Sequence, residues 1–500
     1  MADAEYGFRY AVFVTDNGVR YLTNEVSLQI MDALALSGMT ASDLSLALGR
    51  SRTSIQSNVS KLERWGFVTS YVDESDRRRV IYVPTSTVIL RPCPPDIGED
   101  YEALEEEALH NMVKVRGGHY PCMLVIMALE AMRMGLDMRD LLTRGGMILA
   151  SKHRRLVSGM SSEDVARYLE NHFTKVAFSD AAVAFDKGDL NIVLSLHSRM
   201  RIAGHMMCDL AAGYAVETMD VHTGRKHRVA SLTSDAEGRT VMRISPYDGN
   251  VPMDSAVRRT IPDVNDESWP FMIYYVDGRS VLLGNDTQIR ILHHIRRSSA
   301  SPGELSEELG MPLVTVHSNL SKLSELGVIG ADALPSSKMV RYRIKGLPVI
   351  LTTEPCVTMK PERDIRLERE LKSVMAGYEA LFETLNFNLR SAGEDIRHIT
   401  GNVGVRVAEF LVAEDKNITA AGFLKKVCET DMGLGYLPRI TDFVPLTVVL
   451  NRNSDTFCTF GFIKPFYKGL LEHGLELLTG DSYNIRFPPP PDFVRVIKIA

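Results

Sequence analysis

The chain has 500 residues, of which 45% are hydrophobic and 24% are charged, and its net charge is −6. This composition is that of a globular protein with two to four domains, and no apolar run approaches the roughly 20 residues that a membrane-spanning helix needs. The negative net charge argues against a protein that coats nucleic acid indiscriminately, although it is compatible with a local basic face.

Six cysteines are scattered along the chain without a C-x-x-C pair. This usage argues against a disulfide framework and against a cysteine-only zinc site, and it fits a reducing compartment. The first residues lack the basic and apolar segments of a secretory signal. We therefore expect a cytoplasmic protein.

Residues 24–83 have the pattern of three helices followed by a β-hairpin. Apolar residues at helical spacing predict the three helices. Thr40 and Ser51 are expected to cap the second and third helices, and Gly49 is expected to end the second. Arg77–Arg79 leads into the returning strand of the hairpin.

The third predicted helix has one apolar and one polar face. Ile55, Val59 and Leu62 recur at i, i+4 and i+7 and should face the core. The other face carries short polar and basic side chains, which suit base edges and phosphates in a major groove. The residues that we expect to contact DNA in this unit are Ser51, Arg52, Thr53, Ser54, Gln56, Ser57, Lys61, Arg77, Arg78 and Arg79.

The same unit occurs a second time. Residues 24–68 can be aligned on residues 285–329 without a gap, with a constant offset of 285 − 24 = 261. Ser60-Lys61-Leu62 then falls on Ser321-Lys322-Leu323. In the second copy the expected DNA contacts are Thr315, His317, Ser318, Asn319, Lys322, Lys338 and Arg341.

The segment SRTSIQSNVSKLERWGFVTSYVDESDRRRVIYV, residues 51–83, resembles the recognition helix and wing of MarR-like and ArsR-like winged-helix transcriptional regulators. The resemblance implies a recognition helix in the major groove and basic wing residues against the minor groove or the backbone. The second copy lacks the DESDRRR wing, so equal DNA binding by the two copies does not follow from the resemblance.

A helix is expected after each wing. In the first half, residues 101–115 have apolar side chains at three-and-four spacing, and in the second half residues 367–385 have a heptad-like pattern. These helices could pair within one chain, which would give a pseudo-dimer, or between chains, which would give a homodimer. The sequence leaves both arrangements open.

The repetition continues more faintly beyond these helices. Residues 164–169 align on residues 419–424, and the strand-like residues 191–196 align on residues 447–452. Each half is thus expected to contain a mixed helix and strand unit after its winged helix. In the order of its elements this unit loosely resembles the small-molecule-sensing vinyl reductase-like domain, which implies a sensor role.

We therefore predict an α+β fold with an internal duplication. The first half has a winged helix-turn-helix domain at residues 1–92 and a helix plus sensor-like domain at 93–248. A proline-rich linker is expected at residues 249–270. The second half repeats the two domains at residues 271–352 and 353–500.

The sequence also bears on catalysis and on metal binding. Nucleophile elbows, H-E-x-x-H segments, Walker-type loops and G-x-G-x-x-G segments are absent from the sequence, so we do not expect an enzyme. His205 and Cys208 stand at i and i+3 and could hold a transition metal or a haem iron. The neighbouring Met and Leu residues favour an ordinary core helix instead, and no cofactor is predicted.

The sequence predicts a DNA-binding transcriptional regulator. Its expected partners are double-stranded DNA and a small-molecule or protein effector, and no membrane. Two alternatives remain open at this point. The first is a protein–protein adaptor that uses winged helices as docking modules, and the second is a metal- or haem-dependent sensor.

Overall fold

The fold is described from a computed structural model of the chain. The structure describes residues 9–15, 18–73, 76–93, 98–114, 119–151, 153–176, 178–196, 204–247, 269–333, 340–352, 394–395, 397–429, 436–443, 446–452, 460–486 and 493–498. The predicted helix at residues 367–385 and most of the predicted linker lie outside these residues.

The first winged helix, residues 11–92, contains three helices and two small antiparallel sheets. Its elements are β1 Ala11–Thr15, β2 Gly18–Leu22, α1 Glu25–Leu36, β3 Met39–Thr40, α2 Ala41–Leu48, α3 Arg52–Arg64, β4 Val68–Val72, β5 Val80–Pro84 and β6 Thr87–Pro92. Strands β3, β5 and β4 form the sheet of the wing. Strands β2, β1 and β6 form a second sheet, whose fourth strand, β7 Leu136–Asp137, comes from the α+β unit that follows.

Local signals in the sequence set the ends of these helices. Thr40 and Asp43 form a capping box at the start of α2, and Ser51 accepts a hydrogen bond from the backbone of Ser54 at the start of α3. Gly49 ends α2 with φ +60°, a conformation that favours glycine. The predicted caps are therefore confirmed. Core side chains from all three helices are completely buried, among them Ile30, Leu34, Leu44, Ile55, Val59 and Leu62.

The second winged helix, residues 272–352, has the same order of elements. They are β12 Met272–Val276, β13 Arg279–Leu283, α10 Asp286–Ile295, α11 Pro302–Leu309, α12 Leu313–Glu325, β14 Ile329–Ala333, β15 Val340–Ile344 and β16 Leu347–Thr352. An isolated bridge between Ala300 and Tyr342 occurs where the first winged helix has the β3–β5 pair. Ser301 and Glu304 form a capping box at the start of α11, as Thr40 and Asp43 do at the start of α2.

The first α+β unit, residues 98–246, packs helices on an antiparallel sheet of order β10-β11-β9-β8. Its elements are α4 Gly98–Lys114, α5 His119–Arg133, β7 Leu136–Asp137, α6 Arg139–Ser151, α7 Arg154–Val157, α8 Ser162–Val176, β8 Phe178–Asp186, β9 Asp189–Leu196, α9 Gly204–Thr223, β10 His227–Ser234 and β11 Thr240–Pro246. The helix predicted after the first wing is α4, and α5 is an additional helix that the sequence analysis did not identify.

The second α+β unit, residues 394–498, has a sheet with the corresponding order β18-β19-β21-β20. Its elements are β17 Glu394–Asp395, α14 Arg397–Glu414, α15 Ala420–Glu429, β18 Tyr436–Phe443, β19 Leu446–Arg452, α16 Phe460–Thr479, β20 Tyr483–Arg486 and β21 Phe493–Lys498. Of the helices that the structure describes, none is long and apolar enough to cross a membrane.

In each α+β unit two helices cross and pack closely at a glycine. A Cβ atom on Gly213 of α9 would overlap the backbone oxygen of Thr143 in α6, and one on Gly469 of α16 would overlap the backbone oxygen of Gly401 in α14. The backbones of these helices therefore touch, which only glycine permits. The residues at the two crossings are separated by similar numbers of positions along the chain. The offset is 469 − 213 = 256 between α9 and α16, and 401 − 143 = 258 between α6 and α14.

The caps of α8 and α15 correct one detail of the predicted repeat. Ser161 accepts a hydrogen bond from the backbone of Asp164, and Thr419 accepts one from the backbone of Gly422. These two caps are equivalent and differ by 419 − 161 = 258. The predicted alignment of residues 164–169 on residues 419–424, with an offset of 255, is therefore wrong by three residues.

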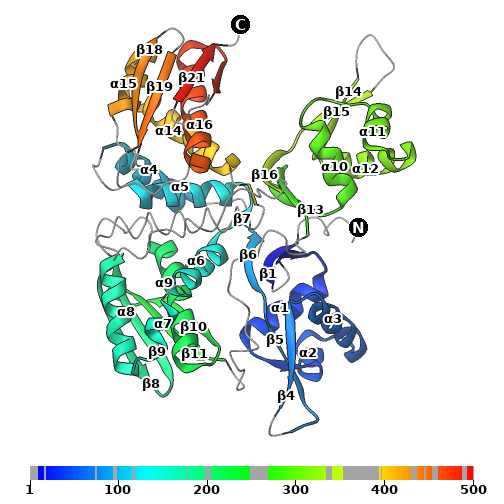
Figure 1. Cartoon of the computed structure of the whole chain (residues 1–500), viewed down its shortest axis with the longest axis vertical. Coiled ribbons are helices and arrows are strands. Elements are labelled where there is room, and N and C mark those ends of the chain that lie inside the picture. The colour runs from blue at the N-terminus through cyan, green and yellow to red at the C-terminus, as the bar shows by residue number, and fades with distance from the viewer. Residues whose placement is uncertain are drawn as a thin grey trace.

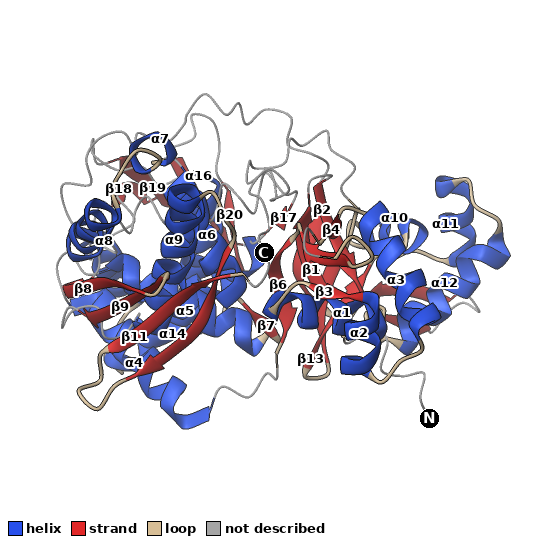
Figure 2. Cartoon of the chain, turned by 90° about the horizontal axis from the view of Figure 1, so that it is seen from below, coloured by secondary structure: helices blue, strands red, loops and turns tan. Residues whose placement is uncertain are grey.

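The four units lie at the corners of a rough square, with the winged helices on one side and the α+β units on the other (Figure 1). The view from below shows the same separation (Figure 2). Helices α4 and α5 belong to the first half in sequence but lie beside the second α+β unit, where α5 packs on α14 (Figure 1). Contacts between the two halves therefore contribute to the fold.

Candidate nucleic-acid interface

Helix α3 exposes the face that the sequence analysis predicted. Ser51, Arg52, Thr53, Gln56, Ser57 and Lys61 are exposed, and Ser54 is half-buried. Ile55, Val59 and Leu62 anchor the opposite face in the core with no exposed surface. The side chains on the exposed face therefore do not pack in the core. Two of them, Arg52 and Lys61, carry positive charges.

Hydrogen bonds fix α3 relative to its surroundings. The side-chain amide of Gln56 donates to the hydroxyl of Tyr82 in β5 at 3.1 Å, which ties the helix to the wing. The hydroxyl of Ser27 in α1 donates to Asn58 Oδ1 at 3.4 Å. Such contacts hold a recognition helix in one orientation, as base recognition requires.

The wing presents two arginines just before β5. The backbone amide of Asp73 donates to the Arg79 oxygen at 2.9 Å, and the amide of Arg79 donates to the Asp76 oxygen at 2.8 Å, which closes a turn at residues 76–79. Arg77 and Arg78 are exposed at this turn. Among the described residues, neither arginine takes part in an ion pair, so both charges are available to an anionic partner.

Arg79 is different from its two neighbours. Its guanidinium lies 3.8 Å from the Asp43 carboxylate and 3.9 Å from that of Asp73. Asp43, in the first turn of α2, thus lies beside the wing. Part of the charge of Arg79 is therefore neutralised within the domain.

Helix α12 of the second winged helix exposes Thr315, His317, Ser318 and Lys322, while Asn319 is half-buried. Its N-cap position is occupied by Pro312, which makes no side-chain cap. The amide of Asn319 donates to the backbone oxygen of Thr315 at 2.8 Å. The predicted polar face is thus present, with less basic charge than on α3.

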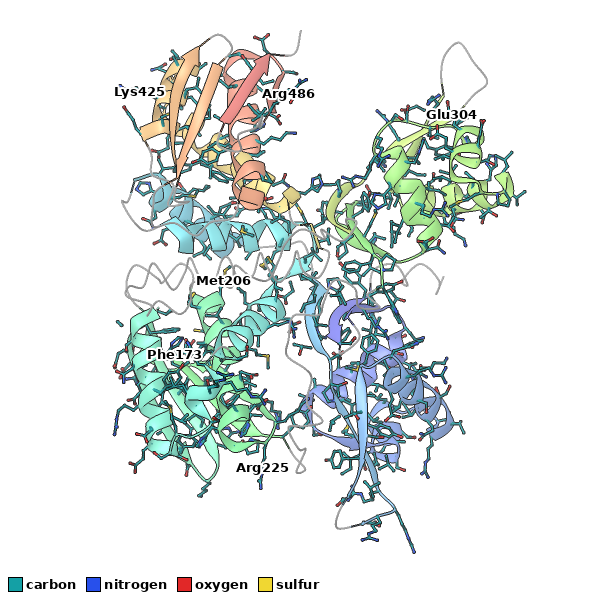
Figure 3. All side chains as sticks on the ribbon, viewed as in Figure 1. Phe173, Met206, Arg225, Glu304, Lys425 and Arg486 are labelled. Atoms are coloured by element: carbon teal, nitrogen blue, oxygen red, sulfur yellow. The ribbon has the colours of Figure 1, made fainter. Side chains whose placement is uncertain are left out.

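The wing of the second winged helix uses its arginines internally. Arg341 donates to Glu304 Oε1 at 2.9 Å and to the hydroxyl of Ser299 at 3.3 Å, so its guanidinium positions the N terminus of α11. Figure 3 labels Glu304 on this helix. Arg343 pairs with Asp332 across the hairpin at 2.8 Å. Lys338 lies outside the described residues. In the part of this wing that the structure describes, less positive charge is therefore free than on the wing of the first winged helix.

Two apolar residues at the start of α12 were missed by the sequence analysis. Leu313 is 47% exposed and Val314 is 80% exposed. With the offset of 261 they fall on Arg52 and Thr53, the first exposed residues of α3. The alignment of the two winged helices could have revealed this difference, because it places apolar residues at positions that are polar in α3.

The two winged helices contact one another. Trp269, just before β12, packs edge-on against Tyr21 and Trp65, with ring centroids 5.5 and 5.4 Å apart. The hydroxyl of Tyr10 donates to Ser280 Oγ at 2.8 Å. Aromatic packing and a buried hydrogen bond thus join the two recognition units within one chain.

The first α+β unit contacts the first winged helix through polar groups. Arg91 in β6 donates to Asp32 in α1 at 2.7 Å and to Asp140 in α6 at 3.1 Å. The ammonium of Lys226 donates to the backbone oxygen of Pro84, at the end of β5, at 2.6 Å. A movement of α6 or of the segment before β10 would therefore act on the winged helix directly.

A polar cluster lies inside the first α+β unit. His153 Nδ1 lies 2.7 Å from the hydroxyl of Tyr214 and 2.9 Å from that of Tyr168. Burial lowers the pKa of His153 and raises that of Tyr214, which favours the neutral form of both groups. In the second α+β unit, the offset of 258 places Leu411 at the position of His153, and the offset of 256 places Leu470 at the position of Tyr214. Both leucines are buried, so the second unit has apolar side chains where the first has this polar pair.

The metal site considered from the sequence gains no support. Cys208 is buried, its Sγ lies 3.1 Å from the hydroxyl of Thr240, and burial raises its pKa to about 11. A metal ligand would have to be the thiolate. The side chain of His205 lies outside the described residues. Within the described part of the chain, no three His, Cys, Asp or Glu residues are arranged to hold a metal ion.

Comparison with known proteins gives one match. The model of the MarR family matches residues 22–79, which run from the end of β2 to the wing arginines. No curated protein and no solved structure matches the chain. The MarR-like part of the resemblance predicted for the first copy is thus confirmed over these residues, and they form a winged-helix domain similar to that of the MarR family of regulators.

Proposed function

We propose that the chain is a DNA-binding transcriptional regulator with two winged-helix recognition units, whose relative placement is controlled by the α+β units. The observation that carries the proposal is the surface of the first winged helix. There the exposed face of α3, with Arg52 and Lys61, stands beside a wing whose Arg77 and Arg78 have no ion pair among the described residues. Side chains of this kind bind base edges and phosphates.

The second recognition unit would be the second winged helix. The same order of elements and the capping boxes at Thr40 and Ser301 support an equivalent origin of the two units by internal duplication. The contact of Trp269 with Tyr21 and Trp65 supports a pseudo-dimer within one chain. In a dimeric helix-turn-helix protein the two recognition helices bind half-sites about one DNA turn apart, and the pseudo-dimer would do the same.

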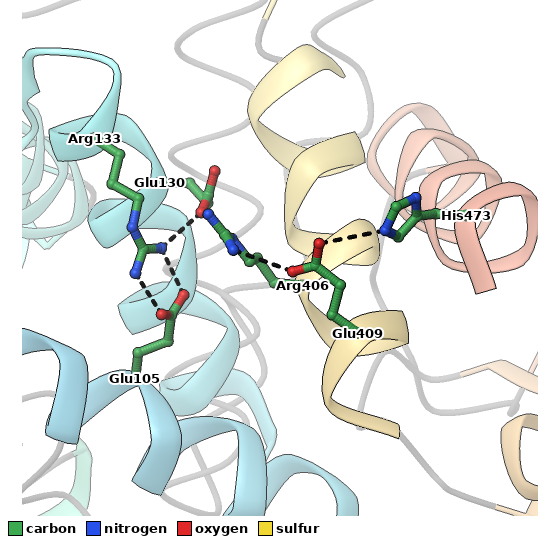
Figure 4. Close-up of polar contacts among 6 residues, drawn as sticks. All are labelled: Glu105, Glu130, Arg133, Arg406, Glu409 and His473. Atoms are coloured by element: carbon green, nitrogen blue, oxygen red, sulfur yellow. Dashed lines mark hydrogen bonds and ion pairs between the residues drawn. The ribbon is translucent and has the colours of Figure 1, made fainter. Parts of the chain in front are cut away.

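The α+β units would transmit a signal from an effector. The support lies in two contacts between the first winged helix and the first α+β unit, Arg91 with Asp140 and Pro84 with Lys226, together with an ion network between the halves (Figure 4). In this network Arg406 of α14 donates to Glu130 of α5 at 2.9 Å, and Arg133 donates to the same carboxylate oxygen at 2.7 Å. A ligand that shifts one unit would change the spacing of the recognition helices.

A footprint of the whole chain on DNA upstream of its own coding region tests the proposal. We expect two protected segments whose centres are separated by about one turn, roughly 10 base pairs. The Arg77→Ala/Arg78→Ala variant should weaken protection mainly in one segment. Absence of any protection at about 50 mM salt, where phosphate contacts are strong, would contradict the proposal and would leave the adaptor function.

A further inference from the structure

The first turn of α12 carries two apolar side chains that the fold does not use. Val314 is 80% exposed and Leu313 is 47% exposed, whereas Val316 and Leu320 on the same helix have no exposed surface. The hydrophobic core of the second winged helix therefore does not include Leu313 and Val314. Side chains that stay exposed gain no burial free energy on folding, and two adjacent exposed aliphatic side chains therefore mark a candidate binding site.

The position of the pair indicates what it meets. In a helix-turn-helix the N-terminal residues of the recognition helix contact the edges of the bases. Leu313 and Val314 occupy this turn of α12, as Arg52 and Thr53 do on α3. The inference below rests on the proposed function, because it assumes that α12 enters a major groove.

The chemistry of the groove then narrows the choice of base. The 5-methyl group of thymine is the apolar group that base pairs present in the major groove, whereas arginine pairs with the acceptor atoms of guanine. We propose that Leu313 and Val314 contact thymine methyl groups. The second half-site is therefore thymine-rich, and the first half-site contains a guanine recognised by Arg52.

The surroundings of the pair favour DNA over a protein groove. Thr315, Ser318 and Lys322 are exposed on the same helix and supply hydroxyl and ammonium donors for phosphate oxygens. A stable protein interface instead needs a contiguous apolar core within a patch of about 800 Å² on each partner. Two aliphatic side chains flanked by polar ones therefore match a pair of thymine methyl groups better than they match a protein interface.

Selection of binding sites from a random DNA library by the full chain is the first test. We expect an enriched sequence with two unlike half-sites, one with a guanine and one rich in thymine. Arg52→Ala should relax the guanine preference alone, and Val314→Ala the thymine preference alone. Leu477→Ala serves as the control, because it removes an aliphatic side chain that is 49% exposed on α16, away from both recognition helices.

Deoxyuridine gives a sharper test, since it removes the methyl group and leaves every hydrogen-bonding group of thymine in place. Replacing the thymines of the second half-site should weaken binding of the wild-type chain about fourfold per contacted methyl, which corresponds to about 0.8 kcal/mol. Val314→Ala should show a smaller loss on the same substitution. The Leu477→Ala control should behave as wild type.

The possible failures can be told apart. If no sequence is enriched and no DNA is bound, the proposed function fails and this inference fails with it. If DNA is bound but both half-sites contain the same guanine pattern, the proposed function stands and the inference is overturned. Equal affinity for thymine and deoxyuridine sites would overturn the inference in the same way.

Discussion

The hydroxyl of Tyr21 in β2 donates a hydrogen bond to the backbone oxygen of Gly284, directly after β13, at 2.9 Å. The contact is close, since a Cβ atom at position 284 would overlap the phenol of Tyr21. Trp269 packs edge-on against the same ring. These contacts hold the two winged helices together and set the separation of α3 and α12.

We predict that Trp269→Ala loosens this separation. Wild-type affinity should fall sharply when the spacing between half-sites is changed by half a turn, about 5 base pairs, because one helix then faces the wrong side of the DNA. The variant should bind the original site more weakly and should tolerate the altered spacing better. Titrations on a series of spacings measure both effects. An unchanged spacing preference would show that other contacts fix the two units.

The network between the halves gives a second prediction. The Glu130 carboxylate is buried and accepts from both Arg133 and Arg406. Glu130→Gln removes the negative charge between two guanidinium groups, which should weaken the packing of α14 on α5. Hydrogen exchange of the α14 amides should become faster. Lys425→Ala, which removes an exposed charge in the same unit, is the control, and equal exchange in both variants would contradict this role for Glu130.

A third prediction concerns pH. Burial raises the pKa of Asp209 in α9 to about 7, although the nearby Arg139 acts to lower it. An unfolded aspartate has a pKa of about 3.9, so the folded state holds an extra proton between about pH 4 and pH 7. The stability that this proton provides is fully present below about pH 4 and is lost as the pH rises through about 7.

The neutral variant Asp209→Asn should therefore gain stability relative to wild type as the pH rises. The difference in melting temperature, variant minus wild type, should be larger at pH 8 than at pH 5. Asp180→Asn, which changes an exposed carboxylate of β8, is the matched control. A difference that does not change with pH would show that Asp209 is ionised in both states over this range.

The glycine crossings give a fourth prediction. Gly213→Ala and Gly469→Ala each place a methyl group against the backbone of the facing helix. Overpacking of this kind costs about 1–3 kcal/mol, so each variant should have a lower midpoint of thermal unfolding. Gly159→Ala is the control, because a Cβ atom there meets nothing within 4 Å. Wild-type stability in both variants would mean that the helices are less closely packed.

Much of the recognition unit could be predicted from the sequence because its signals are local. Thr40 and Ser51 cap helices through residues three positions away, and Ile55, Val59 and Leu62 define one helix face by their spacing. Ion pairs between distant residues left no such signal. The pairing of Arg79 with Asp43 depends on how β5 folds back, which no spacing rule supplies.

The α+β units were harder to predict for two physical reasons. Apolar residues on an amphipathic helix recur every three or four positions, so an alignment shifted by three residues still places apolar on apolar, as happened at residues 164–169. The packing of α5 on α14 joins residues such as Glu130 and Arg406, which are far apart in sequence. Such contacts follow from the complete fold and not from local pattern.

The most direct test of DNA recognition is a titration of the full chain on its selected site over a series of salt concentrations. Each phosphate contact contributes about 0.9 to the slope of log affinity against log salt. We predict salt-sensitive binding by the wild-type chain and a slope shallower by up to about 2 in the Arg77→Ala/Arg78→Ala variant. Arg225→Ala/Lys425→Ala, which removes two charges from the α+β units, should keep the wild-type slope (Figure 3). No binding at low salt, or equal slopes for wild type and the Arg77→Ala/Arg78→Ala variant, would contradict DNA recognition by the first winged helix.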